Sequence, residues 1–303
     1  MVLSSLFPVF VLLLLGRIMK RRGWTDDAFL ATSDRLIYFV FFPVLLFWKI
    51  GAARSGALLD WKLCGGVLLS LTAVYLISAV CIRLFRIPAF KAGSFSQSTY
   101  RFNTYIGMAV VYSALGDEGV QRFGVLIGFL IPLINVAAVA TLIWYAGRRP
   151  AFLQQVKATL GAIVTNPLIV ACAAGVLYAR TMPGFPPFLE NAFRLTASVT
   201  LPLALLSIGG ALSFQRLKGN LRLALLSSVI KLALLPVIGY VVLRQFQVAG
   251  LSFKVGMLYF CLPTSSAMYV LSARFNSDTA LASATIVLST VLSFFSLSAA
   301  LLL

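Results

Sequence analysis

Residues 61–83 read WKLCGGVLLSLTAVYLISAVCIR, a run in which nearly every side chain is apolar or small. An α-helix rises about 1.5 Å per residue and the hydrocarbon core of a bilayer is about 30 Å thick, so a run of this length can cross a membrane. The run is too long and too uniform for the alternating pattern of a transmembrane β-strand. It therefore predicts a transmembrane helix.

The rest of the chain repeats this pattern. Of its 303 residues, 60% are hydrophobic and 11% are charged, with a mean hydropathy of +0.98, whereas about a quarter of the residues of a soluble domain are charged. Apolar runs separated by short polar turns predict an all-α polytopic membrane protein with ten transmembrane helices. The predicted spans are 2–19, 30–50, 61–83, 92–115, 120–146, 158–179, 189–213, 222–244, 253–273 and 279–302.

The loops differ in their basic residues. The loops on one side of the predicted spans carry more Lys and Arg than those on the other, beginning with the cluster Arg17, Lys20, Arg21 and Arg22. Because cytoplasmic loops are enriched in basic residues, this asymmetry predicts that both termini lie outside the cytoplasm and that the loop after the first span lies inside it. The cluster follows the first apolar run, the reverse of a signal peptide, so we expect that run to remain in the mature protein.

The charge and the cysteines exclude several functions. A net charge of +17 could suggest nucleic acid, but it is spread over loops between apolar helices, so we expect no nucleic-acid partner and assign it to the anionic lipid of the bilayer. The cysteines are scattered through apolar spans without paired spacing, so we expect packing residues and neither a metal nor a cofactor. They are Cys64, Cys81, Cys172 and Cys261.

The two halves of the chain share a pattern at an offset of 159 residues. The matched positions are Pro8 and Pro167, Gly16 and Gly175, Arg35 and Arg194, Leu36 and Leu195, and Pro43 and Pro202. This offset predicts a first five-helix repeat over 1–146, a cytoplasmic connecting loop over 147–157 and a second repeat over 158–303. Because five is odd, the second repeat would cross the membrane in the opposite direction, as in many secondary transporters.

The fourth helix of each predicted repeat is interrupted. Residues 96–107 are the most polar stretch within any span, and the shifted position, 261–266, contains Pro263. Proline removes a backbone donor, and Gly107 with Asn103 offers a weaker break. Unwound backbone is tolerated in a membrane where it is buried in protein or lines a wet cavity, so two matched breaks predict a solute site. The polar residues assigned to it are Asn103, Thr104, Tyr105, Thr264, Ser265 and Ser266; hydrogen bonding between helices is the alternative role of the hydroxyls.

Basic and neutral polar residues lie near the same depth. Lys231 is central to the eighth span, where an ammonium costs about 3 kcal/mol or more and should face the protein interior. It could attract a carboxylate, change protonation during transport, or extend to the headgroups. Arg101, a candidate for coupling or gating, and Asn135 are placed beside the same site, although Asn135 could simply tie helices together. An interior poor in acids favours an anion over a cation.

The acids lie in or beside the predicted loops, and the chain has no histidine. A carboxylate or histidine relay for protons therefore has few candidate members. Asp34, beside Arg35 at the mouth of the second span, is the candidate acid for coupling or gating, and a local ion pair is its alternative role. The residues leave the coupling ion, H+ or Na+, open.

Several segments together resemble the auxin efflux carrier family, whose bacterial members include malonate-transporter-like proteins. The likeness covers the whole chain and is carried by 34–43, 101–107, 166–169 and 262–267. It implies two inverted five-helix repeats whose broken fourth and ninth helices cross, and elevator-like transport of small carboxylates. Carried over, the solute site is Asn103 to Gly107 with Pro263 to Ser266, and homodimers would be expected.

The sequence departs from the family at three places. Asp34 stands where the family often has asparagine, Met108 stands where it often has proline, and the loop over 147–157 is short, as in a bacterial-type member.

Two other functions are alternatives to a carrier for a small organic anion. A sodium-coupled symporter of the bile acid type would need clustered oxygen ligands. An integral-membrane enzyme acting on lipid would need a nucleophile, metal ligands or an acid–base pair, so we expect no enzyme.

Overall fold

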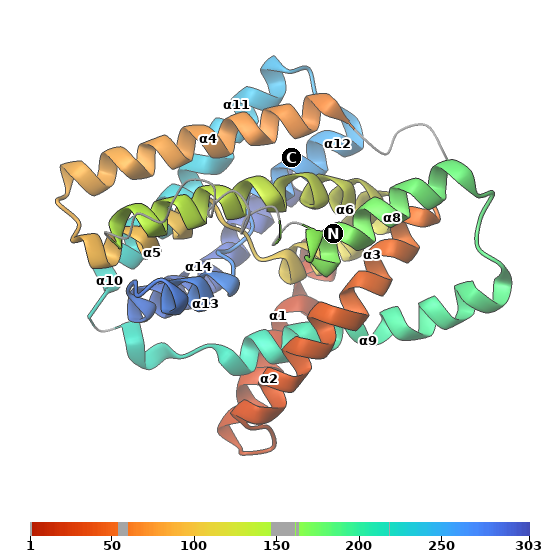
Figure 1. The fold of residues 1–303 in the computed structure, drawn as a ribbon, viewed down its shortest axis with the longest axis horizontal. Helices are drawn as coiled ribbons and strands as arrows, with labels where there is room; N and C mark the ends of the chain where they lie inside the picture. Colours follow the sequence, from red (N-terminus) through yellow and green to blue (C-terminus); the bar gives the residue numbers. More distant parts are fainter. Residues whose placement is uncertain (1, 54–59, 147–160, 162–163, 218) are drawn as a thin grey trace. The chain divides into compact units, whose positions relative to one another are not determined.

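The computed structural model describes residues 2–53, 60–146, 161, 164–217 and 219–303. Within these ranges every regular element is a helix and none is a strand (Figure 1), which confirms the all-α prediction. The predicted connecting loop, 147–157, lies outside the described residues.

The helices follow one another in chain order. The first group is α1 (Val2–Arg21), α2 (Asp27–Leu36), the π-helix η1 (Ile37–Phe41), α3 (Phe42–Gly51), α4 (Trp61–Leu84), α5 (Ala89–Tyr100), α6 (Thr104–Tyr145) and α8 (Pro167–Thr181). The second group is α9 (Pro187–Ala211), the 3-10 helix η2 (Phe214–Leu217), α10 (Leu221–Val229), the π-helix η3 (Ile230–Leu234), α11 (Leu235–Gln245), α12 (Gly250–Phe260), α13 (Ala267–Arg274) and α14 (Thr279–Leu301).

In the described part of the chain, seven helical stretches are long and apolar enough to span a membrane. One of them, Ala89–Tyr145, contains two of the predicted spans, and α6 within it has a non-helical residue at Gly116, with φ 63°. The apolar helix α8 is shorter, and the predicted span 253–273 is divided into α12 and α13. The count of ten spans, which includes these shorter helices, stays a prediction.

Polar residues set several helix starts. The Asp26 carboxylate accepts from the backbone N–H of Phe29 at 2.7 Å at the start of α2, and Asp278 caps α14 in the same way. The side-chain oxygens of Asn103 and Asn166 cap α6 and α8. Since each cap satisfies a backbone donor that the helix cannot, these residues fix where the helices begin.

A proline follows each π-helix at the same distance. Pro43 comes two residues after η1, and Pro236 comes two residues after η3. Proline has no N–H and its ring crowds the preceding turn, so the backbone widens there instead of continuing as a regular α-helix. Lys231 lies within η3, in the part of the helix that the proline perturbs.

The chain forms two compact units. Unit 1 comprises 1–60, 108–131 and 159–211, and unit 2 comprises 61–107, 132–158 and 212–303. Each unit therefore takes helices from both halves of the sequence. The units are groups of residues that pack together, whereas the predicted repeats are consecutive halves of the sequence. The repeats stay a prediction.

Unit 1 is built on close helix pairs, α1 against α9 and α3 against α8 (Figure 1). A Cβ atom on Gly16 would overlap the backbone carbonyl of Leu206, and one on Gly209 would overlap that of Leu13. Only glycine permits so close an approach of two helix backbones, which is a common mode of packing in membranes. These glycines fix the separation between α1 and α9.

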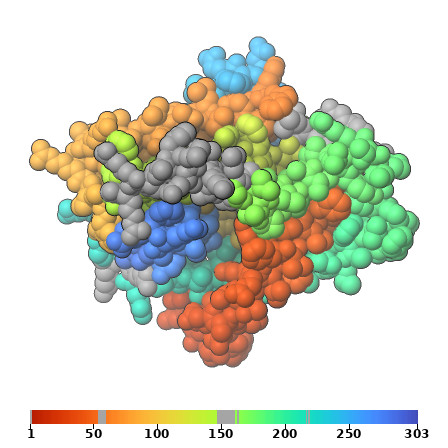
Figure 2. Space-filling view, viewed as in Figure 1, coloured from red at the N-terminus to blue at the C-terminus, as the bar shows by residue number. Residues whose placement is uncertain are grey.

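Unit 2 has an apolar surface and a hydroxyl-rich interior. Figure 2 shows α4, in orange, at the surface, and its side chains Leu69, Leu76 and Val80 are exposed, as expected beside lipid. Inside, Ser94 lies 2.8 Å from Ser272, Oγ to Oγ. Hydroxyls can hydrogen-bond between helices or to their own backbone, so they can be buried in this interior at little cost.

Gly16→Ala should destabilise the protein, because the added methyl group would force α1 away from α9. Overpacking of this kind costs about 1–3 kcal/mol. The midpoint of thermal unfolding in detergent, followed by size-exclusion fluorescence, should fall by several degrees. Gly161→Ala is the matched control in unit 1, since a Cβ there would have nothing within 4 Å. A wild-type midpoint for Gly16→Ala would contradict the packing described.

Candidate functional site

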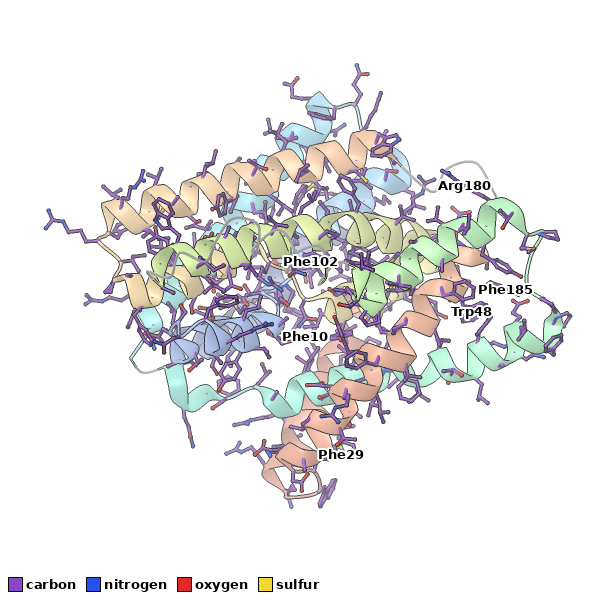
Figure 3. The ribbon with its side chains drawn as sticks, in the orientation of Figure 1. Phe10, Phe29, Trp48, Phe102, Arg180 and Phe185 are labelled. Atoms are coloured by element: carbon purple, nitrogen blue, oxygen red, sulfur yellow. The ribbon has the colours of Figure 1, made fainter. Side chains whose placement is uncertain are left out.

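The first interruption lies between α5 and α6. After Tyr100 the backbone is extended at Arg101, and α6 begins at Thr104. Phe102, labelled in Figure 3, lies within this break. The Asn103 Oδ1 atom accepts from the N–H groups of Tyr105 and Ile106, both at 3.1 Å, and so caps α6.

The prediction that Gly107 contributes to the break is wrong. Gly107 lies in the first turn of α6, and its N–H donates to the carbonyl of Asn103 at 3.0 Å. The interruption comprises Arg101 to Asn103, because the Asn103 side chain caps a new helix that begins at Thr104. Gly107 then continues this helix.

The second interruption lies between α12 and α13. Residues 261–266 separate the end of α12 at Phe260 from the start of α13 at Ala267. Pro263 lies within it, as predicted. The Thr264 N–H donates to Ser289 Oγ at 3.1 Å, and the Thr264 hydroxyl donates to the carbonyl of Ser98 at 2.8 Å. A side chain from α14 and a carbonyl from α5 therefore hold this segment.

The two interruptions contact each other inside unit 2. The Asn103 N–H donates to the carbonyl of Pro263 at 2.9 Å. The Asn103 side chain is 1% exposed and Thr264 is fully buried. Backbone groups that leave a helix in an apolar interior need partners, and here each broken helix supplies one to the other.

Three buried side-chain nitrogens beside these breaks have no hydrogen-bond partner among the residues that the structure describes: Arg101 Nε, Asn103 Nδ2 and Lys231 Nζ. The Arg101 guanidinium also donates through Nη1 to Asn135 Oδ1 at 3.0 Å. Unsatisfied buried donors are costly, so these three nitrogens are available to water or to a ligand that accepts hydrogen bonds.

Tyr259 lies between the breaks and Lys231, and it was not among the predicted site residues. Its ring centroid is 4.5 Å from that of Phe102 and 5.9 Å from Lys231 Nζ. Ser98 and Ser289, which hold Thr264, were also missed. The signal for Tyr259 was its place two residues before Cys261, at the end of a helix ahead of Pro263.

The other predicted residues are placed as follows. Thr104, Tyr105, Ser265 and Ser266 are half-buried on the two breaks, as is Asn135 on α6. Asp34, in contrast, belongs to unit 1, where the Ser207 hydroxyl donates to its carboxylate at 2.5 Å. The structure therefore groups the predicted site residues of unit 2 and places Asp34 outside that group.

The polar groups of unit 2 can bind a ligand through hydrogen bonds and charge. Within the described ranges, no group of three or more His, Cys, Asp or Glu side chains could hold a metal ion. What unit 2 offers a ligand is amide, hydroxyl, guanidinium and ammonium groups around two broken helices.

Comparison with known proteins relates the sequence of this chain to a family. The model of a family described as "Membrane transport protein" matches residues 1–301. The chain belongs to this family, the auxin efflux carriers. It is similar to an uncharacterized transporter of Methanothermobacter thermautotrophicus, with 23% identity over 97% of this chain and 95% of that protein. It is also similar to one of Methanocaldococcus jannaschii, with 21% identity over 94% and 93% of the two chains.

Membership in the auxin efflux carrier family confirms the resemblance seen in the sequence. It establishes an integral membrane protein of a transporter family, in agreement with the apolar helices. The archaeal relatives share the transporter description over nearly the full length.

Replacing Asn103 should separate its two roles in this carrier. Asn103→Ala removes the cap of α6 and should lower the free energy of unfolding by about 1 kcal/mol, whereas Asn103→Ser retains a capping oxygen and should lose only a few tenths. Both variants lose the unpartnered amide nitrogen. Thermal unfolding in detergent measures the difference, and equal stabilities of the two variants would contradict the capping role.

Proposed function

We propose that this protein is a secondary transporter that moves a small organic anion, a mono- or dicarboxylate, by alternating access. The observation that carries the proposal is the set of unpartnered nitrogens on Arg101, Asn103 and Lys231 beside two interrupted helices. A carboxylate would satisfy all three kinds of donor, and its charge is opposite to that of the two cations.

The charge balance of unit 2 supports an anion. Its sequence contains one acid, Asp278, and that carboxylate lies 3.7 Å from the Lys91 ammonium. Two opposite charges 4 Å apart attract by about 4 kcal/mol at an effective dielectric constant of 20. A buried cation without an acid therefore favours a carboxylate strongly, while a cationic solute would meet repulsion.

Helix ends supply the remaining contacts in the proposed site. The α6 and α13 helices begin at the two breaks, and helix starts carry partial positive charge from their free N–H groups. Thr104, Tyr105, Ser265 and Ser266 lie in these first turns or just before them. On this proposal the hydroxyls and backbone N–H groups orient the carboxylate, with Pro263 and Asn135 shaping its surroundings.

Reciprocal contacts in unit 1 support the inverted repeat on which alternating access would rest. Gly16 approaches the carbonyl of Leu206, and Gly175, its counterpart 159 residues on, would place a Cβ 3.2 Å from the carbonyl of Phe47, the counterpart of Leu206. The Thr200 hydroxyl donates to the carbonyl of Phe41, its own counterpart, at 3.2 Å. Such reciprocity is expected when two copies of one fold are related by a two-fold axis.

The remaining parts of the proposal follow the family and the charge pattern. We place the protein in a bacterial inner membrane with both termini in the periplasm, moving its solute by an elevator-like motion and forming a homodimer. Its coupling ion is H+ or Na+.

Binding of a carboxylate panel tests the proposed function. Purified protein is titrated with acetate, lactate, malonate and succinate while thermal unfolding and binding heat are followed. At least one of these anions should stabilise the protein with a saturable dependence on concentration. Choline, a cation without a carboxylate, serves as the ligand of opposite charge. Stabilisation by none of the carboxylates, or by choline instead of them, would contradict the proposal.

Two substitutions locate the binding site. Asn103→Ser and Lys231→Ala should each lower the affinity for the carboxylate about tenfold or more, because each removes a hydrogen-bond donor to a charged group. Asn166→Ser is the matched control, since Asn166 caps α8 in unit 1 with the geometry that Asn103 has in unit 2. Wild-type affinity in both test variants would place the site elsewhere.

A further inference from the structure

Two helices of unit 2 end at the interruptions. The α5 helix stops at Tyr100 and α12 stops at Phe260, so the carbonyl end of each lies at a break. These ends carry partial negative charge. In carriers with discontinuous helices, such ends and the unwound carbonyls bind the coupling cation. The identity of the cation at these ends therefore bears on the coupling.

In this chain, basic side chains stand at both ends. Arg101 is the residue that directly follows α5, and it is buried with 7% exposure. Lys231 lies on η3 and is fully buried, with its Nζ atom 5.9 Å from the ring of Tyr259, the penultimate residue of α12. The protein itself thus places a basic side chain near the end of each of these helices.

The two cations differ in what they can do. A guanidinium does not lose its proton in proteins, and Arg101 is held by Asn135. A lysine amine can be neutral or charged, and Lys231 Nζ has no hydrogen-bond partner that would hold it in one state. Burying an ammonium without a partner is costly, whereas a neutral amine is tolerated. An incoming carboxylate would reverse that balance.

The neighbours of Lys231 contain no acid that could stabilise its charge. On α12 and on the elements packed against η3, the charged and titratable groups are Lys91, Tyr100, Arg222, Tyr240, Arg244, Lys254 and Tyr259, with Arg101, Cys261 and Asp278 next to helix ends.

One of these groups, Tyr259, faces the Lys231 amine, with 5.9 Å between the Nζ atom and the ring centroid. The acid Asp278 is already paired with Lys91, and the Arg244 guanidinium stacks on Tyr240. The carboxylate that would neutralise Lys231 must therefore come from the solute.

We propose that Lys231 is the proton-carrying residue of the transport cycle and that it replaces a coupling sodium ion at the carbonyl end of α12. This inference rests on the proposed function. When the carboxylate binds, a proton from the aqueous phase adds to the lone pair of the neutral Nζ atom. When the carboxylate leaves on the other side, the N–H bond breaks and the proton returns to water. Anion and proton then cross together.

Proton uptake on binding tests the proposal. Binding heats for the panel carboxylate that binds most tightly are measured at several pH values between 6 and 9, in phosphate and in Tris, whose ionisation heats differ. Wild-type protein should take up protons when the carboxylate binds. The uptake should approach one proton per carboxylate towards pH 9, where the amine of the free protein is neutral. Lys231→Arg, whose charge is fixed, should bind the carboxylate with no uptake. Lys254→Arg is the matched control on the exposed side of α12 and should behave as wild type.

A second measurement needs no solute. Lys231→Met removes the amine and should raise the midpoint of thermal unfolding, by more at pH 6 than at pH 9, because only the charged amine carries the large desolvation cost. Replacing sodium with choline at constant ionic strength should leave the wild-type affinity within about twofold.

The outcomes separate the two proposals. Failure of every carboxylate to bind overturns the proposed function and the coupling with it. Binding without proton uptake, a stabilisation by Lys231→Met that does not depend on pH, or a tenfold dependence on sodium overturns the role of Lys231 alone.

Discussion

The hydrogen bond between the Asn103 N–H and the Pro263 carbonyl is the contact on which the site depends. An apolar interior offers no water to backbone groups, so a helix can stop there only if something else satisfies its freed donors and acceptors. Each broken helix does this for the other, and Thr264 adds bonds to α5 and α14. Two interruptions can therefore coexist where either one alone would leave unpaired polar groups in an apolar interior.

Much of this arrangement is visible in the sequence. Long apolar runs define helices because only helices satisfy their own backbone in lipid, and a proline within such a run marks a weak point. That reasoning identified the stretch around Pro263 and the polar stretch containing Asn103. It also singled out Lys231, because an ammonium is expensive wherever a membrane helix carries one.

Other features were not predicted from the sequence. The first break ends at Asn103, because its side chain caps the start of α6. Gly107, four residues later, lies inside this helix and does not interrupt it. Lys49 is buried on α3 and pairs at 2.7 Å with Asp117, which follows the bend at Gly116. The partner is 68 residues away, so only the folded chain brings the two together.

The two units differ in ways that suit different parts of a carrier. In unit 1, α1 and α9 touch backbone to backbone at Gly16 and Gly209, a contact that allows little sliding because a carbonyl already occupies the space a side chain would need. In unit 2, hydroxyls and unpartnered donors surround the breaks, so its interior gains most from a bound ligand. On the proposed elevator mechanism, the first property suits a scaffold and the second suits the part that carries solute. If so, rigidity and solute binding are assigned by packing chemistry, and each unit has recruited helices from both halves of the sequence to obtain it.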